Sequence, residues 1–90
     1  MKELTLDFSA IRSPLALHQY LKTAFGFPEH YGHNMDALWD CLYHWYGEPV
    51  LITLTHMEDL YKHTPQSAQT LTALLRELEQ RDPMVTVQIR

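Results

Sequence analysis

Apolar positions along the chain recur with two periods, and these predict where strands and helices lie. Residues 2–8 alternate between polar and apolar side chains, as in a half-buried strand. Residues 50–55 form a continuous apolar and β-branched run, which is typical of a strand buried on both faces. Residues 84–89 predict a third and final strand.

Helical periodicity fills the first interval between these strands. A first helix is predicted to begin at Ser13-Pro14, because serine is a good N-cap and proline fits the first helical position, and to end at Gly26. Asn34 is a natural N-cap for a second helix, which is predicted over residues 35–46.

The second half of the chain predicts two more helices. Thr55 and Glu58 have the spacing of a capping box, which predicts a short helix through about Tyr61. A longer helix, with leucines at i, i+3, i+4 and i+7, begins at Thr64 and stops at Asp82.

The predicted order of elements is therefore β–α–α–β–α–α–β. Strands that are separated by helical crossovers pair in parallel. We expect one domain over residues 1–90, of the α/β class, in which about four helices pack on a small three-stranded parallel sheet. Ninety residues suffice for a single core without disulfides or metals.

Composition narrows the cellular setting and the classes of ligand. No run approaches the 18 or so consecutive apolar residues of a membrane span, and the N-terminus has no signal-peptide pattern. The single cysteine, Cys41, cannot form an internal disulfide, which fits a reducing compartment, so we expect a cytoplasmic protein without membrane contact. The net charge of −4 argues against direct nucleic acid binding, because phosphate binding needs a basic surface.

Charge is unevenly distributed along the chain. Between Lys22 and Lys62 there is no lysine or arginine but there are six acidic residues, so this segment contributes −6 and the rest of the chain +2. We interpret the segment as an acidic face for a cationic partner.

The second predicted helix lies inside this acidic segment. Asp36 and Asp40 are four residues apart, where like charges cost a helix about 0.2–0.5 kcal/mol. Asp36 suits the first turn, because a carboxylate there interacts favourably with the helix dipole, whereas Asp40 has no structural reason and is the stronger functional candidate. Trp39 borders this face beside Tyr43, and both are residue types that are enriched at binding hot spots. The opposite, core side is expected to carry Leu38, Cys41, Leu42 and Trp45.

The sequence has no pattern of a catalytic or cofactor site. It lacks a dinucleotide-binding G-x-G-x-x-G, a phosphate-binding P-loop and a G-x-S-x-G nucleophile elbow. Cys41 is predicted to be an inert buried thiol. We therefore expect neither catalysis nor a cofactor. A weaker alternative is a zinc site made by residues of the acidic segment, although their spacing matches no zinc signature. Its candidate ligands are His30, His33, Asp36 and Asp40.

A long and specific block of residues runs from Pro28 to Leu42. It reads Pro28-Glu29-x-Tyr31-Gly32-x-Asn34-x-Asp36-Ala37-Leu38-Trp39-Asp40-Cys41-Leu42, with further matches at Ile11-Arg12-Ser13, Leu17-His18-Gln19 and Arg76-Glu77. With these residues the chain resembles the barstar family of intracellular inhibitors of secreted bacterial ribonucleases. The resemblance implies a three-stranded parallel sheet with packed helices, and a second helix that plugs a ribonuclease active site together with the loop before it.

The resemblance also implies which residues contact the partner. Asp40 is central among them, since its carboxylate takes the place of an RNA phosphate among the enzyme's arginines. The predicted partner-binding residues, including His30 in the loop and Tyr43 beside the acidic face, are His30, Tyr31, Gly32, Asn34, Asp36, Trp39, Asp40, Tyr43, Leu74 and Glu77.

Three features depart from the family pattern. His30 stands where the best-known barstar has a tyrosine contact, Arg81 stands where it has an acidic residue, and its second cysteine is missing here.

We predict 1:1 inhibition of a small cationic ribonuclease of the barnase-like, guanyl-specific type. Two alternatives remain: an immunity or antitoxin-like protein for a different toxin domain, and a barstar-like regulatory domain without a nuclease partner, responsive to metal through His30 and His33.

Overall fold

A computed structural model of the protein describes residues 1–43 and 47–90. Over these residues it has strands β1 (Lys2–Asp7), β2 (Val50–Thr55) and β3 (Val85–Ile89). Its helices are α1 (Pro14–Phe25), α2 (Met35–Leu42), α3 (Met57–His63) and α4 (Pro65–Arg81). The order β1–α1–α2–β2–α3–α4–β3 confirms the order predicted from the sequence.

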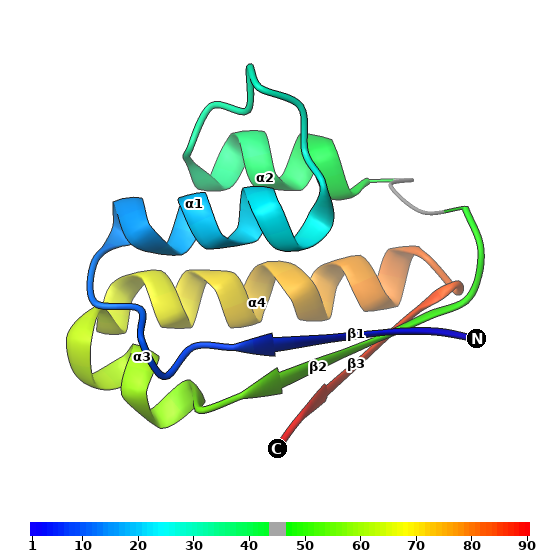
Figure 1. Cartoon of the computed structure of the whole chain (residues 1–90). Coiled ribbons are helices and arrows are strands. Elements are labelled where there is room, and N and C mark those ends of the chain that lie inside the picture. The colour runs from blue at the N-terminus through cyan, green and yellow to red at the C-terminus, as the bar shows by residue number, and fades with distance from the viewer. Residues whose placement is uncertain (44–46) are drawn as a thin grey trace.

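The three strands form one parallel sheet in the order β1-β2-β3. Figure 1 shows α1, α2 and α4 running roughly alongside one another above this sheet, with α3 at the end where α4 begins. The structure therefore confirms a small α/β domain with a three-stranded parallel sheet.

The core lies between the sheet and the long helices. Leu6 of β1 and Leu54 of β2 are paired in register, and both are completely buried. Leucines at helical spacing on α4 close the core from the other side, as their periodicity predicted. Burying each such side chain contributes about 1.5–3 kcal/mol relative to leaving it exposed.

Strand β2 is not buried on both faces, contrary to the prediction from its apolar run. Leu51 and Thr55 are only partly buried, and Thr5 and Thr86 on the flanking strands are exposed. On this face Thr53 is nevertheless buried, and its hydroxyl accepts a hydrogen bond from the Gln88 amide at 3.0 Å. The helices thus cover one face of the sheet, and the other face carries mostly polar side chains, with Leu51 among them.

The ends of α1 follow the sequence, whereas the end of α2 does not. Ser13 Oγ accepts from the Ala16 amide at 3.1 Å, and Gly26 ends α1 in the left-handed conformation with φ 72°. Helix α2 was predicted to continue to residue 46, but it ends at Leu42, because Tyr43 is extended with ψ 117°. The predictions for His44, Trp45 and Tyr46 lie outside the described residues.

The predicted capping box before α3 is wrong. The N-cap of α3 is His56, in the left-handed conformation with φ 59°, and it makes no side-chain cap. Thr55 instead ends β2, and its hydroxyl donates to the carbonyl of Leu6 on the neighbouring strand at 3.1 Å. The threonine therefore ties two strands together rather than starting a helix.

Two side chains of α4 close the outer edge of β3. Glu79 Oε2 accepts from the Val87 amide at 2.7 Å, and Arg76 Nη1 donates to the Val87 carbonyl at 2.8 Å. Arg76 and Glu79 also pair with each other at 3.2 Å. Because both backbone groups of Val87 are satisfied, this edge cannot template another strand there.

No helix in the described part of the chain is long and apolar enough to cross a membrane.

Candidate functional site

The acidic helix α2 is held in place by its N-cap and by its buried side. Asn34 Oδ1 accepts from the Ala37 amide at 2.8 Å, and its Nδ2 donates to the Gly32 carbonyl at 3.1 Å. Leu38 and Leu42 are buried against the core. The opposite side of the helix faces outward, as its predicted amphipathicity requires.

Gly32 lets the preceding loop lie close to the start of α2. A Cβ at this position would lie 3.2 Å from the Cβ of Ala37 and 3.4 Å from Nδ2 of Asn34. The separation from Ala37 is tighter than an ordinary contact, so the loop or the helix would have to shift by a few tenths of an ångström to accept a larger residue here. The glycine thus serves the fold, and the partner contact that the family resemblance implies for it stays a prediction.

Tyr31 anchors the same loop from below. Its ring is 4% exposed, and its hydroxyl lies 2.7 Å from Nδ1 of the buried His18. Burial raises the pKa of Tyr31 to about 12, so the hydroxyl stays protonated. His33, in the left-handed conformation, donates from Nδ1 to the Tyr31 carbonyl at 2.9 Å. In this conformation the Tyr31 ring belongs to the core, and it supports the loop that carries the exposed His30.

A groove of about 340 Å³ lies between α2 and α4. It brings together four of the residues predicted from sequence, with two carboxylates around an aromatic and an aliphatic side chain. Its lining residues are Met35, Asp36, Trp39, Thr70, Ala73, Leu74 and Glu77. We call this feature the acidic groove.

Asp40 lies outside the acidic groove, one helical turn beyond Asp36. It is exposed, and its carboxylate makes no hydrogen bond or ion pair with any other described residue. Trp39 and Tyr43 flank it, with ring centroids 5.7 Å apart. Asp36, which is also exposed, has no such partner either among the residues that the structure describes. The two aspartates therefore present their charges to solvent.

Glu77 differs from the two aspartates, because it has a cation beside it. Arg81 Nη2 lies 3.3 Å from Glu77 Oε1 on the same face of α4. Both side chains are more than half exposed, so the pair is solvated.

Three lining residues of the acidic groove were missed from the sequence: Met35, Thr70 and Ala73. The signal was present on α4, because positions 70, 73, 74 and 77 have the i, i+3, i+4, i+7 spacing of one helix face. That face is offset by one position from the buried leucine stripe. Leu74 and Glu77 on this face were predicted, whereas the small side chains of Thr70 and Ala73 gave no reason to single them out.

The structure gathers no metal site from the proposed ligands. Within residues 1–43 and 47–90, no three His, Cys, Asp or Glu side chains form a cluster that could hold a metal ion. Cys41 is partly buried rather than fully buried as predicted, and this burial, with the nearby Asp40 charge, raises the pKa of its thiol. A protonated thiol of this kind is a poor nucleophile.

Comparison with known proteins finds a family for this chain and a named relative. The sequence model of one family, described as Barstar (barnase inhibitor), matches residues 1–90. A protein of Bacillus subtilis (strain 168), named "Putative ribonuclease inhibitor YrdF", is 38% identical over 58 residues. The match covers 64% of this chain and 64% of that protein, slightly less than two thirds of either.

Proposed function

The chain belongs to the barstar family, and from this membership we propose that it is a proteinaceous inhibitor, not an enzyme. Its target in this proposal is a small cationic ribonuclease of the barnase-like type, bound 1:1. The inhibitor inserts α2 and the loop before it into the active site of the enzyme, so that RNA is excluded.

The observation that carries this proposal is the state of Asp40. Its carboxylate is exposed and has no partner among the described residues, in a segment without any lysine or arginine. A carboxylate in the last turn of α2 that makes no hydrogen bond or ion pair with any other described residue is available for another protein. A ribonuclease holds RNA phosphates with cationic side chains, so its cleft offers the complementary charges.

Binding in this proposal replaces phosphate contacts with carboxylate contacts. Asp40 and Asp36 accept charge-assisted hydrogen bonds from the arginines of the enzyme, which can be bidentate. Trp39 and Leu74 supply apolar surface in the acidic groove beside these pairs. Water excluded by that surface no longer screens the pairs, which strengthens them.

The decisive experiment compares two isosteric neutralisations. Asp40→Asn keeps the size of the side chain and the helix, but it leaves a cation of the enzyme buried without a counter-charge, which costs about 3–5 kcal/mol. Glu58→Gln removes the same charge from an exposed position on α3 within the same Lys/Arg-free segment. Inhibition of RNA cleavage is measured against a panel of small ribonucleases.

We expect inhibition by the native protein and by Glu58→Gln, and its loss with Asp40→Asn. If Asp40→Asn inhibits a ribonuclease as well as the native protein does, the proposed binding mode is wrong. If no ribonuclease in the panel is inhibited by the native protein, the target class is wrong.

Arg81 favours a second candidate within the same binding mode. It places a cation at the end of the acidic groove, where a strongly basic enzyme surface would be repelled. An immunity-type role against a toxin domain with an acidic rim next to its cationic cleft would fit this charge. Such toxin domains therefore belong in the panel.

A further inference from the structure

Three helices begin at the same end of the molecule, and their first turns meet at a second cavity. Figure 1 shows α1, α2 and α4 all starting at the left end. The cavity has a volume of about 410 Å³. Each helix contributes the residues at its start, and these are Pro14 and Leu15 of α1, Asn34 and Met35 of α2, and Gln66 and Ser67 of α4. We call it the helix-end cavity.

The start of a helix carries partial positive charge, because its first N–H groups have no partner within the helix. Neither α1 nor α4 has an acidic residue in its first turn to offset this charge. Thr64, at the N-cap of α4, makes no side-chain cap. Pro65 has no N–H, and the Ala68 amide donates to the Thr64 carbonyl at 3.0 Å, so the first-turn N–H groups without a partner among the described residues are those of Gln66 and Ser67. Among the described residues, no carboxylate lines the cavity.

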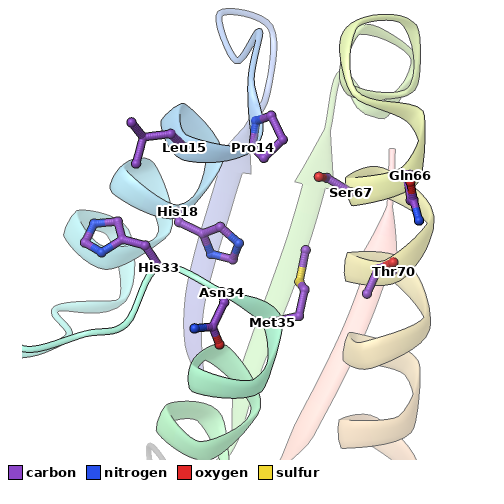
Figure 2. Close-up of a pocket in the computed structure, with 9 residues that line it drawn as sticks. All are labelled: Pro14, Leu15, His18, His33, Asn34, Met35, Gln66, Ser67 and Thr70. Carbon is purple, nitrogen blue, oxygen red and sulfur yellow. The ribbon is translucent and has the colours of Figure 1, made fainter.

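A buried histidine provides a second, independent feature of the same cavity. His18 is only 4% exposed, and its ring faces the space between α1 and α4, as Figure 2 shows. Its Nδ1 lies 2.7 Å from the Tyr31 hydroxyl, while its Nε2 has no partner among the described residues.

The tautomer of His18 follows from its neighbour. The Tyr31 hydroxyl keeps its proton and has no other hydrogen-bond partner among the described residues, so it donates to Nδ1. Burial also lowers the pKa of His18, which keeps the ring neutral. The one ring hydrogen of His18 is then on Nε2, where it is an unused donor at the wall of the cavity.

We propose that the helix-end cavity binds a phosphate-type oxyanion, which accepts hydrogen bonds from His18 Nε2 and from the donors at the start of α4. Helix starts are a common setting for phosphate binding, since the dipole and the free N–H groups act together. The tetrahedral anion presents oxygens to donors on both sides of the cavity, one from α1 and others from α4. The oxyanion contacts do not rest on the proposed ribonuclease inhibition, although the cavity shares Met35 and Thr70 with the acidic groove.

The size and lining of the cavity indicate which kind of molecule can bear the oxyanion. The cavity is larger than one phosphate ion, and Pro14, Leu15 and Met35 form an apolar wall within it. Free inorganic phosphate would fill only the polar part. A nucleoside monophosphate would add contacts between its organic part and the apolar wall, and so would bind more tightly.

The test is a titration of the whole native protein, followed through the ring nitrogens of its histidines by NMR. Inorganic phosphate and AMP are added separately at fixed pH, with ionic strength held constant by chloride. We expect a saturable shift of the His18 Nε2 signal below about 20 mM ligand, where a site with a Kd of about 1 mM is almost full. Tighter binding of AMP identifies a nucleotide-type ligand, and equal binding identifies the phosphate group alone.

Matched variants separate the site from general charge effects. Ser67→Asp places a carboxylate in the cavity but suits the first turn of α4, so the protein still folds. Gln69→Asp adds the same charge to α4 at an exposed position outside the cavity. We expect at least a tenfold loss of affinity with Ser67→Asp and less than a twofold loss with Gln69→Asp. The proposal is overturned if neither ligand shifts His18, or if Ser67→Asp binds like the native protein.

Discussion

Arg81 reaches back one helical turn to Glu77, so that its Nη2 lies 3.3 Å from Glu77 Oε1 at the end of the acidic groove. Exposed pairs at this i, i+4 spacing stabilise a helix by only about 0.2–0.5 kcal/mol. The pair therefore matters little for folding. Its consequence is electrostatic, because it cancels one of the two carboxylate charges that line the groove.

Removing this cation should strengthen binding to a basic ribonuclease. Arg81→Gln frees Glu77 from its ion pair and removes a positive charge that repels a basic enzyme. We expect the affinity for the enzyme to improve by about 0.5–1 kcal/mol, or roughly two- to fivefold. Isothermal calorimetry with the inhibited enzyme measures the change. Arg90→Gln, which removes the same charge from the exposed residue that follows β3, is the control and should have no such effect. Weaker binding by Arg81→Gln would mean that Arg81 contacts an acid on the target.

The rate of association should fall steeply as salt is added. The unpaired charges of Asp36 and Asp40 attract a cationic cleft over a distance that shrinks from about 10 Å at 0.1 M salt to about 3 Å at 1 M. Stopped-flow association over this range measures the slope. The double variant Asp36→Asn/Asp40→Asn should give a shallower slope than the native protein. A native rate that does not change with salt would refute electrostatic steering.

The predictable part of this fold was encoded locally. The serine cap of α1 and the continuous run of β2 each depend on a few adjacent residues, and both appeared where they were expected. The same local rules failed where tertiary contacts compete. Thr55 has the spacing of a capping box, but its hydroxyl bonds to Leu6 in the adjacent strand, 49 residues away in sequence.

Only part of the candidate site could be predicted from the sequence, again because local patterns do not specify tertiary contacts. The acidic face of α2 follows from one helical period, so the amino-acid sequence alone was enough to identify Asp36 and Asp40. The acidic groove needs the packing of α2 against α4, which no local pattern specifies. Tyr31 was also ambiguous, because a tyrosine in a polar loop is typical of an exposed contact, whereas here its hydroxyl reaches a buried histidine.

The free protein should lose stability as the pH falls below about 6.5, the ordinary pKa of histidine. Burial and the charge of His33 lower the pKa of His18 in the folded state, so the unfolded chain takes up this proton first. The contribution of the neutral His18 to the free energy of unfolding is therefore fully present above that pH and is lost as the pH falls below it. Urea unfolding at pH 7.5 and 5.5 measures the effect, which His18→Gln should reduce. His30→Gln, which changes an exposed histidine, should lose as much stability between pH 7.5 and 5.5 as the native protein does. If His30→Gln reduces this loss as much as His18→Gln does, the assignment of the effect to His18 is wrong.

The hydrogen bond from the Val87 amide to Glu79 should stabilise the outer edge of β3, beyond what the helix propensity at position 79 of α4 contributes. In the native protein the Val87 amide donates to Glu79 Oε2 at 2.7 Å, and Glu79→Ala leaves this buried amide without an acceptor. We expect the substitution to lower the free energy of unfolding by about 1–3 kcal/mol. Glu79→Gln keeps an acceptor oxygen and should cost less. Gln80→Ala, at an exposed neighbour on the same helix, is the control for helix propensity. Because an open edge can pair with another chain, Glu79→Ala should also aggregate faster on mild heating, as followed by light scattering. Equal stability of Glu79→Ala and Gln80→Ala would show that solvent satisfies the Val87 amide and that the edge needs no side-chain cap.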